Sequence, residues 1–356
     1  MRIALAADHR FTADADAAVA EVLRRDLAAV AVCCRRQLRG GTLRLGGSFA
    51  LGEGVAFADG ERVVVLSDLD LFLVIPGGPL RALATAAWLR RRLMGAAAVR
   101  LDLTVLARGL IRAGLQGLGP LPRVAGDPRG QTGGFNRGFP LHALHALQAE
   151  LLDVAPCGCG ADLRGRYGVN RCALAALRAL RAIEEPAARS LRGAVAWAEA
   201  GGVPGLPARA RALVAEACDE NLALALARRS LASGGWPRWC AARDLLDALR
   251  VRLGARISPA DRFKACPRLG WTSARRGLRP RLVGDVHPRL AALRHDLLHA
   301  RGEDGEIDGD RVAHAVGDLV ALGLLAGASP GDPEAAWRSA VAAARLDNPL
   351  RVVVDP

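Results

Sequence analysis

The sequence predicts an α+β protein in which a small mixed β-sheet with a helical cover is followed by a larger α-helical domain. The part before Leu106 has short β-rich stretches between helical segments, whereas apolar residues beyond Leu141 recur almost only at helical spacing. A stretch dense in glycine and proline, Gly117 to Pro140, separates the two patterns. With 356 residues the chain is long enough for two domains, which we expect at 1–135 and 136–356.

The elements of the first domain follow from apolar spacing and from turn residues. Gly40 and Gly41 end the first helix, and a turn at Asp59-Gly60 precedes the longest β-rich stretch. In chain order we expect a helix at Asp14–Leu38, a strand at Thr42–Leu45, the β-rich stretch at Val63–Ile75, a helix at Pro79–Met94 and a strand at Ala98–Leu106.

The second domain is predicted to be helical, with proline or glycine between its helices. Asn170 is interpreted as the N-cap of the first of them. The expected helices are Arg171–Ile183, Ala187–Ala198, Ala208–Ala227, Ala241–Leu253, Pro288–Ala300, Asp310–Leu325 and Pro333–Leu346.

Three aspartates lie on the predicted strands. Strand alternation places Asp68 and Asp70 on one face, and it places Asp102 opposite the leucines that flank it. Neighbouring carboxylates repel one another unless a cation lies between them. Three converging carboxylates suit a two-metal site for phosphoryl transfer, so we expect Asp68, Asp70 and Asp102 to bind divalent metal ions.

A glycine-serine turn precedes the aspartates. Gly46 and Gly47 allow the chain to turn tightly and to bring backbone N–H groups close to an anion. The Ser48 hydroxyl can donate to a phosphate oxygen, and a helix is expected to start just after it. The turn and the acids together predict a pocket for a metal-bound triphosphate.

Gly47-Ser48 after one strand, Asp68-Leu69-Asp70 on the next and Asp102 on a third resemble the signature of the DNA polymerase beta-like nucleotidyltransferases. The resemblance covers the first domain and looks closest to bacterial nucleotidyltransferase-domain proteins. It implies a nucleotidyltransferase palm followed by a helical domain that clamps the nucleotide and selects the acceptor. It also implies that the three aspartates are catalytic and hold Mg²⁺ or Mn²⁺, and that Gly47 and Ser48 bind the nucleotide.

Two features depart from the pattern of that superfamily. Position 51 is Leu51 where many relatives have arginine, which removes a phosphate or orientation contact. The interval between Ser48 and Asp68 is longer than in most relatives, and we assign the excess to a turn or hairpin around Asp59-Gly60. Lys264, the only lysine among 49 basic residues, is a candidate to bind the triphosphate.

These residues predict an enzyme that moves a nucleoside monophosphate from a nucleoside triphosphate, such as ATP, to an unidentified acceptor, a small molecule or a protein, and releases pyrophosphate. The net charge of +13 keeps a polynucleotide tail-adding or oligonucleotide-synthesising enzyme open as an alternative. An arginine excess is also typical of a GC-rich genome, so charge alone does not identify nucleic acid as the partner. A catalytically silent interaction module on the same fold is the other alternative.

The remaining metal-ligating residues have a structural interpretation. The eight cysteines are unevenly spaced, which favours free thiols over a disulfide framework. His295 and His299 share a helix face, but no neighbouring glutamate completes a metalloprotease pattern, so we interpret them as a structural or exposed pair. With no predicted membrane span or signal peptide, the expected location is the cytoplasm, without a membrane partner.

Overall fold

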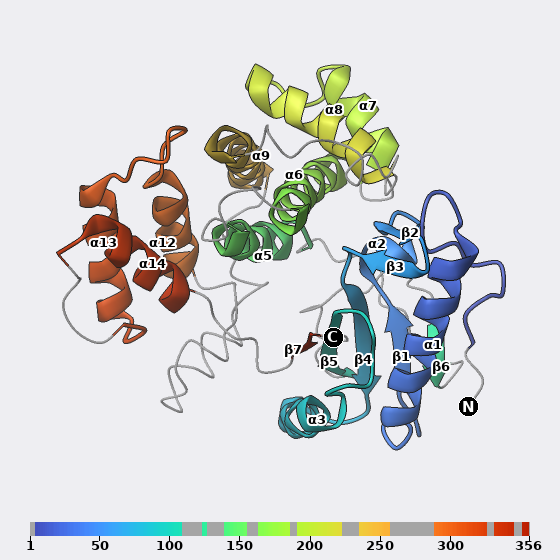
Figure 1. Ribbon diagram of the computed structural model, residues 1–356. Helices are drawn as coiled ribbons and strands as arrows, with labels where there is room; N and C mark the ends of the chain where they lie inside the picture. The colour runs from blue at the N-terminus through green and yellow to red at the C-terminus, as the bar shows by residue number, and fades with distance from the viewer. Residues whose placement is uncertain are drawn as a thin grey trace. The chain divides into compact units, whose positions relative to one another are not determined.

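The computed structural model describes residues 4–108, 123–126, 139–154, 163–185, 191–222, 235–256, 288–325, 331–344 and 351–355. Within these ranges the chain is a mixed α+β structure with eleven helices and a mixed five-stranded sheet (Figure 1). It divides into two compact units. The first contains the strands with α1 to α3, and the second contains the helices from α5 onward. No described helix combines the length and apolarity needed to cross a membrane.

The five-stranded sheet has the order β6–β1–β4–β5–β7. Its strands are β1 (Thr42–Leu45), β4 (Leu69–Ile75), β5 (Leu101–Ala107), β6 (Arg123–Gly126) and β7 (Arg351–Val354). β4 and β5 are parallel and the other neighbours are antiparallel. Helix α3 (Pro79–Arg92) joins β4 to β5 and supplies the crossover that a parallel pair requires.

One face of the sheet carries the hydrophobic core of the first unit. The side chains that alternate onto this face are mainly leucine, and Leu71 and Leu103 are paired across β4 and β5. The apolar sides of α1 (Ala17–Cys33) and α3 pack in the same cluster, with Leu23, Leu27 and Leu89 fully buried. The helix, strand, helix and strand order predicted for this region is therefore confirmed.

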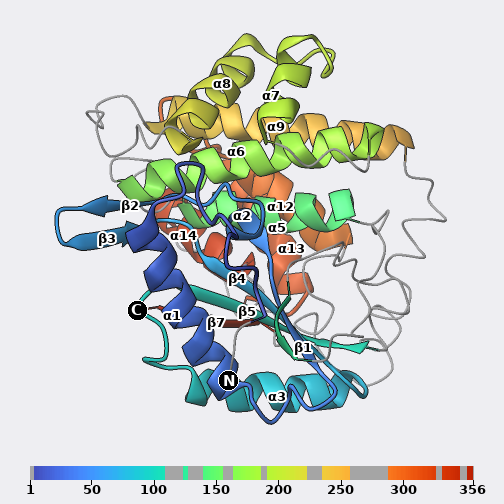
Figure 2. The same cartoon turned by 90° about the vertical axis from the view of Figure 1, so that its right-hand side faces the viewer.

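The β-rich stretch expected at Val63–Ile75 contains two strands, β3 (Arg62–Val65) and β4, rather than one. β3 pairs with the preceding β2 (Ala56–Asp59) in a separate hairpin, which extends from the unit in Figure 2. Its turn contains Gly60, at φ +61°, as the sequence predicted. After β3 the chain turns: the N–H groups of Leu66 and Ser67 both donate to the carbonyl oxygen of Val55, and β4 starts at Leu69.

Two strands of the sheet were not predicted. β6 lies in the glycine-rich and proline-rich stretch that we interpreted as a linker or irregular structure, and β7 lies in the last residues of the chain. Both are four residues long, so periodicity is a weak signal in them. β1 is equally short but was predicted because glycine pairs, Gly40-Gly41 and Gly46-Gly47, lie on both sides of it. The division at 135/136 assigned β7 to the helical domain, whereas it pairs with β5.

The second unit is built from helices whose positions largely match the predicted ones. They are α5 (Phe139–Val154), α6 (Leu163–Glu184), α7 (Leu191–Glu199), α8 (Ala208–Leu222), α9 (Gly235–Arg256), α12 (Pro288–His299), α13 (Gly309–Ala321) and α14 (Pro333–Ala344). The indole N–H groups of Trp239 and Trp337 donate to the carbonyl oxygens of Leu151 and Leu297, so helix pairs are joined by buried polar contacts.

The interpretation of Asn170 as an N-cap is wrong. Helix α6 begins at Leu163, so Asn170 lies inside it, fully buried. Its amide donates to Glu220 at 2.7 Å and its carbonyl oxygen accepts from Arg238 at 2.7 Å. These partners lie on α8 and α9, and no local sequence pattern predicts their contact with Asn170.

Candidate functional site

Asp70 and Asp102 are direct neighbours in the sheet. In the parallel β4–β5 pair, Asp70 is in register with Asp102, and the next pair, Leu71 and Leu103, points into the core on the opposite face. Both aspartates therefore lie on the face away from α1 and α3. Asp102 is 9% exposed, and Asp70 is partly buried. The alternation predicted for these two residues is correct.

Asp68 is placed by a turn and not by strand alternation. It precedes β4, and the N–H of Asp70 donates to the carbonyl oxygen of Asp68 at 3.1 Å, which an extended strand does not permit. The buried Ser67 hydroxyl holds this turn by accepting from the N–H of Val55 at 2.8 Å. Asp68 is 8% exposed, so its carboxylate is largely removed from bulk water.

The glycine-serine turn is in contact with the Asp70 strand. The N–H of Gly46 donates to the carbonyl oxygen of Asp70 at 2.8 Å. Gly47 has φ +59°, and a Cβ atom there would lie 1.9 Å from Asp70 Oδ2. Ser48 follows in the short helix α2 (Gly47–Ala50) and is partly buried. The turn and the acid that the sequence predicted to share a site are thus adjacent.

Arginines form ion pairs with Asp68 and Asp102. Arg351, on β7, donates through Nε to both carboxylate oxygens of Asp102, at 2.9 and 2.7 Å, and its Nη2 also pairs with Asp102. Arg100 Nε lies 3.5 Å from Asp68 Oδ1 and also 3.5 Å from Asp355 Oδ1. No sequence pattern predicted the role of Arg351, because it is 249 residues away from Asp102.

These arginines bear on whether a metal fits the three aspartates. Carboxylate oxygens are the ligands that Mg²⁺ and Mn²⁺ prefer, so the donor type fits. Arg351 supplies a competing positive charge at Asp102. Among the described residues, the only group of three metal-ligating side chains whose ligand atoms all lie within 4.8 Å of one another is elsewhere, at Asp247, His295 and His299.

A cross-strand row that contains three arginines lies next to the acids on the same sheet face. Through the strand register, Arg44 pairs with Arg123 on one side and with Phe72 on the other. Phe72 is in register with Thr104, and Thr104 with Arg351. Burial, and secondarily the charge of Arg123, lower the pKa of the Arg44 guanidinium. No sequence pattern pointed to these cations, which add positive potential beside the carboxylates.

An open hollow of about 320 Å³ adjoins the residues that follow Ser48. It is lined by His9, Arg10, Thr12, Ala13, Ala50, Leu51 and Gly52. His9 Nε2 lies 3.0 Å from the carbonyl oxygen of Phe49, so the N-terminal segment is hydrogen-bonded to helix α2. Leu51 is 42% exposed, and Arg10 brings a cation to the same hollow.

The last predicted site residue, Lys264, lies outside the described residues. The structure therefore places Gly47 against Asp70 and Asp70 beside Asp102, with Asp68 in the adjoining turn. The predicted convergence of the three carboxylates is not found, because their ligand atoms do not all lie within 4.8 Å of one another. No protein-family model, curated protein or solved structure matches this chain.

Proposed function

We propose that this protein is a metal-dependent nucleotidyltransferase that moves a nucleoside monophosphate from a nucleoside triphosphate to an acceptor and releases pyrophosphate. The observation that supports the proposal most directly is the contact of Gly47 with Asp70, beside Asp102. It puts an anion-binding turn and paired carboxylates on one sheet face, the two components that such a transfer needs. The second unit would then act as the helical domain that clamps the nucleotide.

In this proposal each residue has a distinct task. Asp68, Asp70 and Asp102 would hold Mg²⁺ or Mn²⁺, which neutralises charge on the transferred phosphoryl group. Gly47 and Ser48 would bind the triphosphate through backbone N–H groups and the hydroxyl. Arg351 would leave Asp102 when a metal ion binds there, because the two cations compete for one carboxylate.

The experiment that tests the proposal is incubation with each labelled nucleoside triphosphate plus Mg²⁺ or Mn²⁺, with and without cell extract. Pyrophosphate release and a labelled product are expected. Asp70→Asn should abolish both while the protein stays folded, whereas Asp59→Asn, at the exposed end of the β2–β3 hairpin, should leave them intact. Equal turnover in the two variants would refute the assignment of Asp70.

The Arg351–Asp102 pair supports a second candidate function, a catalytically silent interaction module. Arg100 and Arg351 supply counter-charges to Asp68 and Asp102 without a metal ion. This candidate predicts no pyrophosphate release with any triphosphate and unchanged stability on adding Mg²⁺ or Mn²⁺.

The net charge of +13 keeps a polynucleotide acceptor as a variant of the first proposal. Binding to a single-stranded oligonucleotide would then weaken steeply with salt, because binding releases condensed counterions. Absence of binding at low salt would leave a small molecule or a protein as the acceptor.

A further inference from the structure

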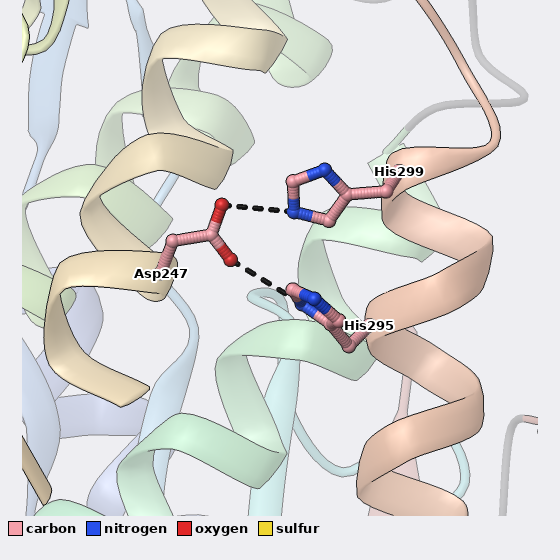
Figure 3. A group of neighbouring side chains, drawn as sticks. All are labelled: Asp247, His295 and His299. Carbon is pink, nitrogen blue, oxygen red and sulfur yellow. Dashed lines mark hydrogen bonds and ion pairs between the residues drawn. The ribbon is translucent and has the colours of Figure 1, made fainter. Parts of the chain in front are cut away.

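The second unit contains a group of metal-ligating side chains that the proposed transfer reaction does not use. Asp247 lies on α9, and His295 and His299 lie on α12. Figure 3 shows both imidazole rings directed at the one carboxylate from the neighbouring helix. The histidines are four residues apart, which puts them on one face of α12, with ring centroids 4.3 Å apart.

The distances within the group suit a small coordination sphere. His295 Nδ1 lies 3.3 Å from Asp247 Oδ1, and His299 Nε2 lies 2.8 Å from Asp247 Oδ2. One ligand atom from each residue lies within 4.8 Å of the others. Neighbouring ligands of a tetrahedral Zn²⁺ ion are about 3.3 Å apart, given metal–ligand bonds near 2.0–2.1 Å. Small side-chain rotations would therefore suffice to accommodate an ion.

The two helices are also fixed against each other at this point. Arg243, one turn before Asp247 on α9, donates through Nη1 to the carbonyl oxygens of Leu298 and Arg301, at 3.3 and 2.9 Å. These contacts hold the end of α12 beside α9. The three ligand side chains are 22 to 31% exposed, so an ion can reach them from solvent.

We propose that Asp247, His295 and His299 form a binding site for a divalent transition metal ion of the Zn²⁺ class. Two imidazole nitrogens and one carboxylate oxygen are ligands that select Zn²⁺, Co²⁺ or Ni²⁺ over Mg²⁺. Three protein ligands leave a coordination position for water. The site links α9 to α12 and is independent of the proposed nucleotidyl transfer.

The electrostatics of the group agree with this geometry. Burial by itself raises the pKa of the Asp247 carboxyl, but hydrogen bonds from His295 and His299 outweigh burial, and the net effect lowers that pKa.

The test is titration of the chelator-treated full-length protein with Co²⁺, followed by absorption spectroscopy and calorimetry. One Co²⁺ ion per chain should bind with the visible bands of mixed nitrogen and oxygen coordination and without a thiolate charge-transfer band, whereas an ion at the aspartates of the first unit would have oxygen ligands alone. His295→Ala and Asp247→Asn should each weaken binding by about 100-fold or more, since even a residue that only orients a ligand contributes 10- to 100-fold.

The matched control is His314→Ala, at an exposed position on α13, which should bind Co²⁺ like the wild type. Circular dichroism of each variant establishes that it is folded, and the milder His299→Gln replaces any variant that is not. Zn²⁺ should raise the melting temperature of the wild type but not of Asp247→Asn. Absence of Co²⁺ binding, or binding that survives both substitutions, overturns the proposal.

Discussion

Replacing Gly47 by alanine tests whether the glycine-serine turn and Asp70 act as one site. A Cβ atom at position 47 would lie 1.9 Å from Asp70 Oδ2, and contacts under 3.0 Å essentially never occur. The carboxylate must therefore move by about 1 Å, a misplacement that can lower the rate of a catalysed step by about 100-fold. In Gly47→Ala we expect a loss of that size in pyrophosphate release and weaker binding of Mn²⁺ with nucleotide.

The backbone adds a cost that a control variant can isolate. Gly47 has φ +59°, in the left-handed region where an L-residue is disfavoured by about 1–2 kcal/mol. Gly60→Ala carries the same backbone cost, because Gly60 has φ +61° and a Cβ atom there would meet nothing within 4 Å. Any further destabilisation in Gly47→Ala measures the contact with Asp70, at most about 1–3 kcal/mol.

The assays are urea unfolding of both variants, Mn²⁺ and nucleotide affinity by calorimetry, and pyrophosphate release. Both variants should lose unfolding free energy, and only Gly47→Ala should lose binding and turnover. If Gly60→Ala and Gly47→Ala bind Mn²⁺ and nucleotide equally well, the turn does not position Asp70 for a ligand, and our reasoning is refuted.

Three further predictions concern the charged groups and the thiols. Arg351→Ala should raise the affinity for Mn²⁺ by about fivefold, since a partly exposed ion pair contributes up to about 1 kcal/mol; unchanged affinity in calorimetry would count against Asp102 as a metal ligand. Glu220→Gln should lower the unfolding free energy by about 3–5 kcal/mol in urea titrations, because it removes the counter-charge of the buried Arg166 and one of the two counter-charges of Arg238, which keeps Glu216, whereas the exposed Glu185→Gln should cost under about 1 kcal/mol. Burial raises the pKa of the Glu220 carboxyl, but hydrogen bonds from Arg166 and Asn170 outweigh burial, so the net pKa is lowered. The stabilisation that Glu220 provides is therefore full above its unfolded-state pKa of about 4.3, and it is lost as the pH falls through the folded-state pKa. Thiol titration of the denatured, unreduced protein should find nearly all eight cysteines free, since the five cysteines among the described residues form no disulfide.

Local sequence patterns were sufficient for most of the elements in the first unit. Strand β1 has the predicted bounds, and α1, α3 and β5 lie within or close to theirs. The alternation of leucine with aspartate on β4 and β5 correctly placed Asp70 and Asp102 on one face. These features depend on residues that are near in sequence, where the spacing of apolar side chains is a direct physical signal.

Other features depended on contacts between distant residues. Asp68 is oriented by a turn that Ser67 and Val55 hold, so strand alternation did not describe it. Arg351 reaches Asp102 only because the C-terminal strand pairs with β5. Asn170 was interpreted from its local neighbours, whereas its hydrogen-bond partners lie on two other helices.

The sequence by itself determined the α+β class, the positions of most helices and strands, and the candidacy of Gly47, Ser48 and the three aspartates. Only the tertiary structure decided which cations accompany those aspartates. It also showed that His295 and His299, which we interpreted as a structural or exposed pair, lie in one group with Asp247. The physical reason is the same in both cases: a charge or ligand partner is chosen by distance in space, and helix packing and strand pairing set that distance independently of separation along the chain.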